Sequence, residues 1–395
     1  MLSEQSAATI RATLPAVGAA IGDITSLFYD RMFAAHPELL RDLFNRGNQA
    51  NGAQRQALAG SIAAFASALL ERPDVRPDAM LARIAHKHAS LGITRDQYTI
   101  VHKYLFEAIV EVLGEAVTPE VAQAWNEVYW LMANALIAIE SRLYAEAGAA
   151  DGDTWREYRI VGRYEETADV ATFLVRPVDE GGLPQALPGQ YVSVQVELPD
   201  GAHQIRQYSL TGTAPDALRF AVKRIVGAPD GEVSNFLHDR VREGAVLRVS
   251  APFGDVSLDD ADGPVVLASA GIGCTPIMSM LDHLAATNST RQITVAHGDY
   301  SPATHAFRSD LEQLVAKLGN AQATVWYEVP EGEWPAELTG FVDLRALSIP
   351  SDATAYLCGP LPFLRAVRGQ LLALGLAPEA IHYEVFGPDL WLGQQ

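Results

Sequence analysis

Apolar residues in the first 147 positions recur three and four places apart, the spacing that puts them on one face of an α-helix. Alternating runs typical of strands are scarce there. The helical pattern is interrupted at 36–37, 45–48, 73, 77, 92 and 118–119, where proline, glycine or asparagine occurs. The pattern therefore predicts an all-α domain over 1–147. An exposed linker is expected over 145–153, which is small and acidic with no apolar anchor.

After Thr154 the pattern changes to short strand-like runs separated by Pro-Gly and Asp-Gly turns. These runs predict an antiparallel barrel over 154–260, with strands at Tyr191–Leu198, Arg206–Leu210, Leu218–Ile225 and Ala245–Ser250. From Pro264 onward apolar strands alternate with helices, which predicts a parallel, doubly wound α/β domain over 264–395. Its expected strands are 265–269, 293–297, 323–329 and 355–357, and its expected helices are 276–286 and 307–318.

Composition agrees with a globular protein of roughly three domains, because 49% of the 395 residues are hydrophobic and 19% are charged. The formal net charge of −19, with no basic stretch, argues against nucleic acid and anionic membranes as partners. The longest apolar run, Trp130 to Ile139, is shorter than the ~20 residues of a membrane span, and no leader pattern opens the chain. We expect a cytoplasmic protein. Its two cysteines, Cys274 and Cys358, are too few for a disulfide framework.

Several polar residues fall on apolar helix faces. His88 lies on the inward face of the expected helix 77–91, whereas the nearby His86 points the other way. A single inward histidine is at least as often a core residue with a satisfied partner. Gln54, Tyr98 and Glu140 also lie on apolar faces, and each alone could be a core-edge or snorkelling residue. Because buried polar groups need partners, the four together indicate a polar cofactor pocket.

Two motifs in the second half suit phosphate-bearing cofactors. The run Arg206–Leu210 places an arginine, an aromatic ring and a hydroxyl on one strand, which suits a flavin, although an ordinary barrel strand has the same pattern. The segment 270–276 follows a strand and begins a helix, so its glycines permit close approach to a phosphate. A glycine pair alone is more often a plain turn. Its position after the flavin-like run favours a nucleotide site.

Three segments, FYDRMFAAHPEL (Phe28–Leu39), NQANGAQRQAL (Asn48–Leu58) and IAHKHASLGI (Ile84–Ile93), closely resemble flavohemoglobins, and the resemblance covers nearly the whole chain. It implies an all-α globin, then an antiparallel barrel of the ferredoxin reductase-like FAD type, then a doubly wound NAD-binding domain. The implied cofactors are haem b with its iron, FAD and NAD(P)H. On this resemblance His88 is the proximal iron ligand, and Tyr98 and Glu140 complete a proximal triad.

The resemblance also assigns further positions. In the globin, Phe44 packs on the haem, and Tyr29, Gln54 and Leu58 surround the distal ligand. The implied flavin contacts are Tyr191, Arg206, Gln207, Tyr208, Ser209, Gly231, Val233 and Ser234. The implied nicotinamide-nucleotide contacts are Gly271, Ile272, Gly273, Cys274, Thr275 and Pro276. Near the C-terminus the implied cofactor contacts are Val385, Phe386, Gly387 and Pro388, with Phe386 covering the flavin ring. Lys87 and Glu384 resemble positions where haem and flavin approach each other. The family commonly has glutamine at position 274 and cysteine at position 385.

A triad of this kind makes the imidazole a stronger electron donor, which favours oxygen activation over oxygen storage. The resemblance implies a nitric oxide dioxygenase, which converts nitric oxide and dioxygen to nitrate with electrons from NAD(P)H. An alkyl or lipid hydroperoxide reductase and a haem-based oxygen or redox sensor are the alternatives, and the complete reductase argues against the sensor. We expect a monomer that takes O2 and NO, with a lipid or an azole as a further candidate occupant of the distal pocket.

Overall fold

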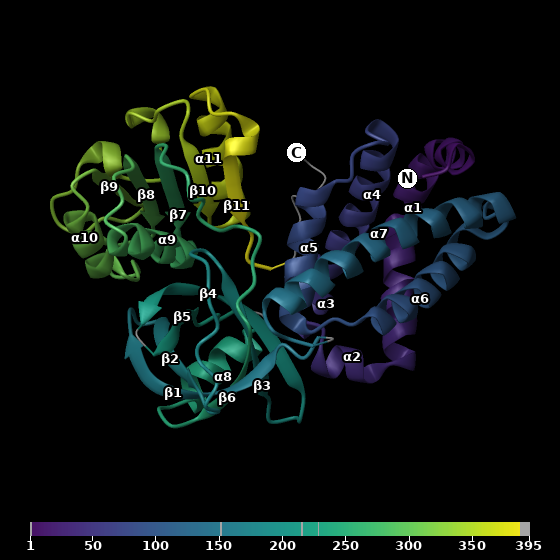
Figure 1. Ribbon diagram of the computed structural model, residues 1–395, viewed down its shortest axis with the longest axis horizontal. Helices are drawn as coiled ribbons and strands as arrows, with labels where there is room; N and C mark the ends of the chain where they lie inside the picture. The colour runs from purple at the N-terminus through teal and green to yellow at the C-terminus, as the bar shows by residue number, and fades with distance from the viewer. Residues whose placement is uncertain (1, 151, 215, 228, 388–395) are drawn as a thin grey trace. The chain divides into compact units, whose positions relative to one another are not determined.

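The structure is a computed structural model that describes residues 2–150, 152–214, 216–227 and 229–387. The chain divides into two compact units, which Figure 1 shows in ribbon form. The described part of the first unit comprises residues 2–150 and 152–155, the segment Glu197–Ile205, and Gly387. The second unit comprises Arg156–Val196 and Arg206–Phe386.

The first unit is helical, as the sequence predicts. Its helices are α1 (Glu4–Ala35), α2 (Pro37–Asp42), α3 (Arg46–Ala50), α4 (Ala53–Glu71), α5 (Asp78–Leu91), α6 (Arg95–Leu113), the 3-10 turn η1 (Gly114–Ala116) and α7 (Pro119–Glu146). The long helix α1 packs against α4, α6 and α7, and α5 packs against α7. The core contains fully buried Ile24, Phe28, Phe65 and Leu81.

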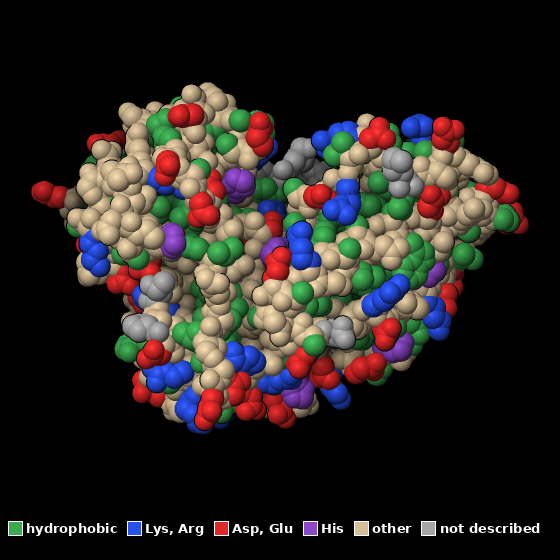
Figure 2. All heavy atoms as spheres, in the orientation of Figure 1, with side chains coloured by type: hydrophobic (Ala, Val, Ile, Leu, Met, Phe, Trp, Pro, Cys, Tyr) green, Lys and Arg blue, Asp and Glu red, His purple; other side chains and the backbone are tan. Residues whose placement is uncertain are grey.

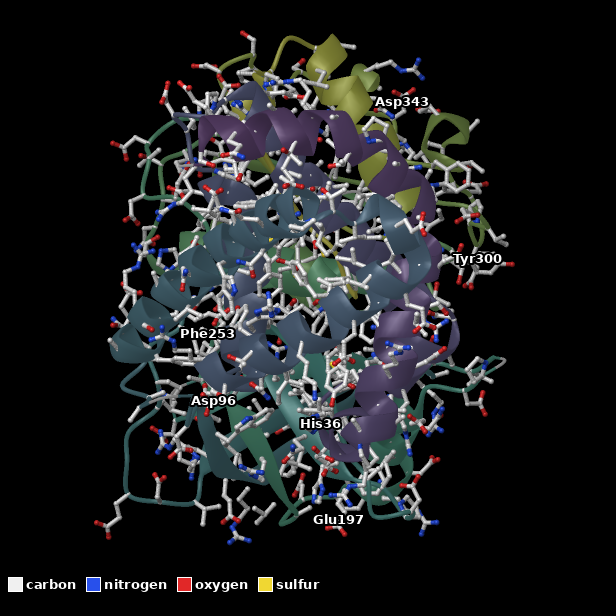
Figure 3. All side chains as sticks on the ribbon, turned by 90° about the vertical axis from the view of Figure 1, so that its right-hand side faces the viewer. His36, Asp96, Glu197, Phe253, Tyr300 and Asp343 are labelled. Carbon is white, nitrogen blue, oxygen red and sulfur yellow. The ribbon has the colours of Figure 1, made fainter. Side chains whose placement is uncertain are left out.

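Polar caps explain where several of these helices begin. Ser3 caps α1, Thr118 caps α7, and Thr94 forms a capping box with Gln97 at the start of α6. His36, labelled in Figure 3, lies between α1 and α2. The break expected at 45–48 lies slightly earlier, because α2 ends at Asp42 and the short helix α3 begins at Arg46. Asn45 accepts a hydrogen bond from the backbone N–H of Asn48, so the asparagine starts a helix.

A hairpin tip holds the α2–α3 segment within the first unit. The tip is Glu197–Ile205, and Glu197 is labelled in Figure 3. Gln204 is fully buried, and its amide nitrogen lies 3.3, 3.0 and 3.2 Å from the carbonyl oxygens of Leu40, Arg41 and Phe44. Its amide oxygen accepts from the backbone N–H of Arg46 at 3.2 Å. The single side chain therefore satisfies backbone groups at the end of α2 and the start of α3.

An ion pair and a histidine–carboxylate contact reinforce this arrangement. Arg46 Nη1 lies 2.6 Å from Asp200 Oδ2, and His203 Nδ1 lies 3.2 Å from Asp42 Oδ1. Hydrogen bonds from Arg41 and from His203 lower the pKa of the Asp42 carboxyl to about 2. Asp42 is therefore ionised at neutral pH and accepts from the His203 backbone N–H at 3.2 Å. The segment that carries Phe44 is thus fixed from outside the helical bundle.

The second unit begins with a closed antiparallel barrel in the strand order β1-β2-β5-β4-β3-β6. Its strands are β1 (Trp155–Glu165), β2 (Val170–Pro177), β3 (Tyr191–Glu197), β4 (His203–Ala214), β5 (Ala217–Lys223) and β6 (Val246–Ser250). Helix α8 (Glu232–Arg240) follows β5. The sequence patterns missed β1 and β2 and placed the start of β4 three residues late, because β4 begins in the polar hairpin tip.

A parallel sheet in the order β11-β10-β7-β8-β9 completes the second unit. Its strands are β7 (Val265–Ala270), β8 (Ile293–Asp299), β9 (Ala321–Tyr327), β10 (Thr354–Cys358) and β11 (Ile381–Glu384). The longer helices are α9 (Cys274–Ala286), α10 (Arg308–Lys317) and α11 (Leu361–Ala373), and the 3-10 turns are η2 (Gly271–Gly273), η3 (Ala336–Leu338), η4 (Leu344–Ala346) and η5 (Pro378–Ala380). The sequence patterns missed α11 and β11.

The predicted order of an all-α domain, an antiparallel barrel and a parallel α/β domain is confirmed. The barrel and the parallel sheet belong to one unit, where Arg219 pairs with Asp310 at 2.8 Å and the Tyr356 hydroxyl accepts from the Asp259 N–H at 2.9 Å. Acidic and basic side chains are mixed over the face that Figure 2 shows. Among the described residues, the helices lack the combined length and hydropathy that crossing a membrane requires.

We predict that Gln204→Leu destabilises the first unit, because it removes the hydrogen bonds that the amide makes with the Arg46 N–H and with nearby helix carbonyls. Each group left unpaired costs about 1–3 kcal/mol. Thermal unfolding followed by helical circular dichroism should show a lower midpoint than the wild type. Gln123→Leu, at an exposed position on α7, is the control. Equal midpoints for the two variants would contradict the role given to Gln204.

Candidate functional site

A buried carboxylate holds the inward histidine of the first unit. His88 lies in the last turn of α5, and its Nδ1 is 2.9 Å from Glu140 Oε1 on α7 and 2.9 Å from the Tyr98 hydroxyl on α6. The Tyr98 hydroxyl also donates to Glu140 Oε1, and Glu140 is 2% exposed. A carboxylate only accepts hydrogen bonds, so Nδ1 carries the imidazole proton and donates it to Glu140.

This tautomer leaves the lone pair on the opposite ring nitrogen of His88. No hydrogen bond or ion pair reaches Nε2 from the residues that the structure describes, and the side chain is 32% exposed. Burial and the charge of Glu140 raise the pKa of Tyr98 far above its usual range, so Tyr98 stays a donor. A neutral imidazole held at Nδ1 and open at Nε2 fits the axial ligand of a haem iron.

Tyr29 and Phe44 also lie close together. The Tyr29 ring on α1 packs edge-on against the Phe44 ring at 5.9 Å, and Phe33 packs against Phe44 at 5.3 Å. Tyr29 is 2% exposed. Burial raises its pKa well above the usual value, although Gln54 and Gln49 beside the hydroxyl act in the opposite direction. Tyr29 is therefore neutral and has a proton to donate.

The apolar stripe of α4 changes in exposure along its length. Phe65 and Leu69, in its second half, are buried, whereas Leu58 and Ile62 are only half-buried although they lie on the same face. Gln54 opens this stripe and is also half-buried. Apolar side chains on an inward face are usually buried, so the first half of α4 borders space that a flat apolar group can fill. This stripe fits a haem.

Sequence analysis missed Gln49, on the short helix α3. Both atoms of its side-chain amide are buried and have no hydrogen-bond partner. A helix of five residues has no amphipathic periodicity, and the glycine and asparagines at 45–48 are more typical of a break. The resemblance of NQANGAQRQAL covered Gln49 but assigned it no role.

The predicted flavin residues gather where β4, β3 and α8 meet. Arg206 Nη2 lies 4.0 Å from Glu232 Oε2, in the first residue of α8. Gln207 donates to the Ser193 hydroxyl at 3.0 Å, and Tyr208 stacks on Phe220 at 5.6 Å. Ser209 and Tyr191 are buried. An arginine beside the first turn of a helix fits a pyrophosphate.

Close packing explains the glycine at position 231, directly before α8. A Cβ there would lie 2.5 Å from Ser234 Oγ and 2.8 Å from Ile225 Cβ. Ser234 donates to the Gly231 carbonyl at 3.2 Å, and Val233 is fully buried. Val233 and Ser234 therefore shape the helix start, and its backbone N–H groups are the atoms suited to bind phosphate.

The two glycines of the turn after β7 have different roles. Gly271 has a φ of +52° and open space where a Cβ would stand. A Cβ on Gly273 would lie 2.4 Å from the carbonyl oxygen of Cys358, so Gly273 lets α9 pack against the end of β10. Gly271 and Ile272 are half-buried, whereas Cys274, Thr275 and Pro276 are buried. The accessible backbone for a phosphate is therefore at 271–272.

Neither cysteine thiol is available for chemistry at this turn. Cys274 and Cys358 are free and buried. Burial raises the pKa of both thiols, which keeps them protonated.

The predicted C-terminal residues follow β11. Glu384 ends the strand, Val385 is half-buried, and the Phe386 side chain is 48% exposed, which is unusual for phenylalanine. Lys87 Nζ donates to the Gly387 carbonyl at 3.0 Å. Pro388 lies outside the described residues.

A polar network that sequence analysis also missed lies at the carboxyl ends of β7, β8 and β9. Ser269 Oγ is 2.9 Å from His297 Nδ1, and His297 Nε2 is 3.4 Å from Asp299 Oδ2. His305 stacks on His297 at 4.2 Å, and its Nδ1 is 2.8 Å from the Tyr327 hydroxyl. All five residues are buried, so the network stabilises the edge of the sheet where doubly wound domains bind nucleotides.

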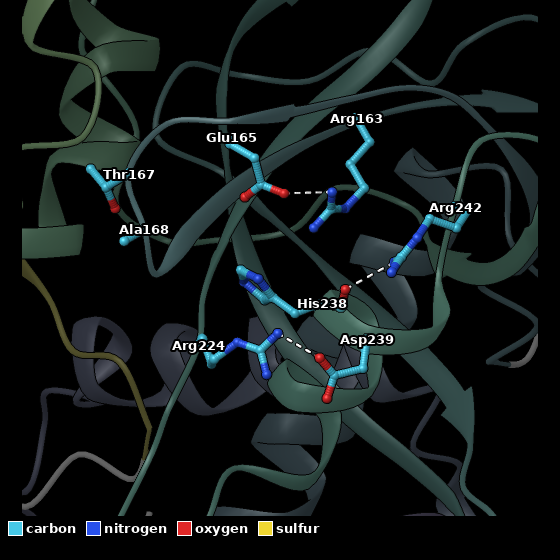
Figure 4. Close-up of a pocket in the computed structure, with 8 residues that line it drawn as sticks. All are labelled: Arg163, Glu165, Thr167, Ala168, Arg224, His238, Asp239 and Arg242. Carbon is cyan, nitrogen blue, oxygen red and sulfur yellow. Dashed lines mark hydrogen bonds and ion pairs between the residues drawn. The ribbon is translucent and has the colours of Figure 1, made fainter.

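A surface pocket of about 580 Å³ lies elsewhere, at the last turn of α8. Its three arginines have partners, as Figure 4 shows: Arg163 pairs with Glu165, Arg224 with Asp239, and Arg242 with the carbonyl of His238. The predicted site residues do not line it.

Comparisons with known proteins agree with this architecture. The chain matches the family model described as globin over residues 26–136 and the one described as oxidoreductase NAD-binding domain over residues 267–369. A flavohemoprotein of Bordetella parapertussis is 44% identical, covering 98% of this chain and 99% of that protein. A flavohemoglobin structure from Malassezia yamatoensis with bound FAD and haem is 38% identical, with a TM-score of 0.91, and covers 98% of this chain and 100% of that one.

A second solved structure resembles the reductase half. It is the flavohem-like FAD/NAD-binding domain of nitric oxide dioxygenase from Vibrio cholerae, 36% identical with a TM-score of 0.55, covering 59% of this chain and 99% of that one. Fold and comparisons together define an NAD(P)H-dependent oxidoreductase in which a globin precedes a reductase. The chain belongs to the flavohemoprotein family.

We predict that His305 makes the second unit sensitive to acid. Burial and neighbouring His297 lower the pKa of His305 from 6.5 to about 3. Below pH 6.5 the unfolded chain takes up a proton that the folded chain refuses, so stability falls between pH 6.5 and 3. One such group costs about 2 kcal/mol at pH 5. In His305→Gln, the drop in unfolding midpoint from pH 7 to pH 5 should be smaller than in the wild type.

His283→Gln, which removes a histidine of α9 outside the network, is the matched control and should keep the wild-type drop. A His305→Gln protein with an unchanged drop would show that another group causes the acid sensitivity.

Proposed function

We propose that this NAD(P)H-dependent oxidoreductase, which uses haem b and FAD, is a nitric oxide dioxygenase that converts nitric oxide and dioxygen to nitrate in nitric oxide detoxification. The contact of His88 with Tyr98 and Glu140 is the observation that carries the proposal. The relative from Vibrio cholerae that bears the name nitric oxide dioxygenase supports the choice of reaction.

Bound haem supplies the iron centre for dioxygen and nitric oxide, and NAD(P)H and FAD supply its electrons. His88 Nε2 would hold the haem iron. The Glu140 carboxylate, 2.9 Å from Nδ1, draws on the Nδ1 proton and increases the basicity of the ring. An electron-rich axial ligand favours oxygen activation over reversible storage. Tyr98 and Glu140 thereby act through His88.

On the distal side Tyr29 donates a hydrogen bond to the substrate. The phenol is neutral and buried, so it has a proton at any physiological pH and little water to compete for it. Gln54 lies beside the hydroxyl, while Leu58 and Phe44 exclude water. The half-buried apolar stripe of α4 also suits an acyl chain or an azole as a further occupant.

The reductase residues hold the electron donors. Arg206 and the start of α8 bind the flavin pyrophosphate, the 271–272 backbone binds the nicotinamide nucleotide, and Phe386 covers the flavin ring. Lys87 and Glu384 are assigned roles in electron transfer from the flavin to the haem. The proposed domains are 1–147, 154–260 and 264–395. We further propose a cytoplasmic monomer, for which the net charge of −19 and the two free cysteines are the support.

The proposed nitric oxide dioxygenase activity predicts fast nitrate formation. When reduced, haem-loaded protein in air-saturated buffer is mixed with nitric oxide in a stopped-flow instrument, we expect rapid oxidation of the haem and one nitrate per nitric oxide. A hydroperoxide reductase would instead be oxidised fastest by an alkyl hydroperoxide. A sensor would be oxidised slowly by both compounds. Slow decay without nitrate would rule out the dioxygenase.

His88→Ala should abolish haem binding while leaving electron transfer from NAD(P)H to FAD intact. Because His88 is the proposed protein ligand of the iron, we expect the Soret band to disappear while NAD(P)H-driven dye reduction through FAD remains. His86→Ala, on the other side of α5, should retain the Soret band. A His88→Ala protein that keeps a normal Soret band would overturn the ligand assignment.

A further inference from the structure

The side-chain amide of Gln49 is buried beside the distal tyrosine and has no partner. Neither Nε2 nor Oε1 makes a hydrogen bond. A buried amide without partners is costly, and native proteins contain few of them. Such groups persist where a ligand or a neighbouring polar group engages them during function.

Gln49 is held in place by its backbone. Asn45 caps α3 at its start, and Gln204 and Asp200 bind Arg46 through its backbone N–H and its guanidinium. Gln49 lies one turn after Arg46 on this anchored helix. The Gln49 amide without partners therefore belongs to a helix, α3, whose position is fixed.

Two amides approach the Tyr29 hydroxyl from different helices, Gln49 from α3 and Gln54 from α4. Arg55 is also nearby, but its guanidinium donates to Ser26 at 3.0 Å and to Asp30 at 3.2 Å. The two amides and the Arg55 Nε–H, which is buried without a hydrogen-bond partner, are thus the polar groups available to orient the phenol. A phenol hydroxyl has one proton to donate and lone pairs that accept.

We propose that Gln49 is a positioning residue of the distal pocket, whose Nε2–H donates to the Tyr29 oxygen and so directs the phenol proton toward the ligand of a bound haem. The direction of this hydrogen bond follows from the chemistry of the amide and the phenol. An amide oxygen facing the phenol would capture its proton, whereas a donating N–H leaves that proton free for the ligand. The inference rests on the proposed haem site and adds a residue that acts through Tyr29.

The test measures ligand binding in the haem-loaded full chain. In Gln49→Leu we expect dioxygen to dissociate about five to ten times faster, the effect of one lost hydrogen bond. The C–O stretching band of the carbon monoxide complex should shift to higher frequency because the ligand loses a donor. Gln49→Glu should shift both readouts further, since its carboxylate accepts the phenol proton. Gln56→Leu, exposed on α4, should match the wild type.

A double variant distinguishes action through Tyr29 from direct contact with the ligand. If Gln49 acts through the phenol, Tyr29→Phe with Gln49→Leu should release dioxygen no faster than Tyr29→Phe alone. Additive effects would overturn the positioning role. Gln49→Met, close in shape to glutamine, replaces Gln49→Leu if the leucine variant does not fold. If the Gln49 variants take up haem normally and keep the wild-type rate of dioxygen dissociation and the wild-type C–O frequency, the role of Gln49 is refuted while the proposed function stands. If the wild type fails to bind haem, the proposed function itself is refuted.

Discussion

The buried carboxylate of Glu140 is the constraint on which the helical unit depends. A carboxylate that is 2% exposed is strongly destabilising unless hydrogen-bond donors reach it. Its donors come from α5 and α6, so three helices must meet at one oxygen atom. Two further tyrosines of α7 fix the same junction, because Tyr129 donates to the Tyr98 carbonyl at 2.6 Å and Tyr144 to the Ile93 carbonyl at 2.7 Å. The imidazole of His88 is thereby held from one side.

The two sides of the proposed haem pocket differ in how their polar groups are satisfied. Tyr98 and Glu140 find partners within the chain, which suits residues whose task is to hold an imidazole. On the opposite side the Gln49 amide makes no hydrogen bond, which suits a group that is to orient the Tyr29 phenol when a ligand binds. The cost of that unsatisfied amide is tolerable because α3 is anchored by Gln204, from the hairpin tip. Stability and ligand binding are therefore assigned to different residues.

Periodicity predicted the three fold classes and the inward position of His88, because long helices and buried strands repeat their apolar positions. It could not predict α3, whose five residues are fewer than two turns, or strand β11, which has four. Gln49 and the His297 network escaped for another reason. Their character depends on which atoms lack or find partners across distant segments, and sequence spacing does not report such contacts. Resemblance to a family supplied the roles of Tyr29 and Arg206, which single residues on apolar faces could not.

In the second unit, as in the proposed haem pocket, different residues serve stability and ligand binding. Ser269 and His297 come from the neighbouring parallel strands β7 and β8, and Ser269 Oγ lies 2.9 Å from His297 Nδ1 at the carboxyl edge of the sheet. At that edge Gly273 is committed to packing against β10, whereas Gly271 keeps an open backbone at a φ of +52°. Packing and ligand binding are thus assigned to different glycines of a single turn, because Gly273 fixes α9 against β10 and Gly271 leaves its backbone accessible to a phosphate.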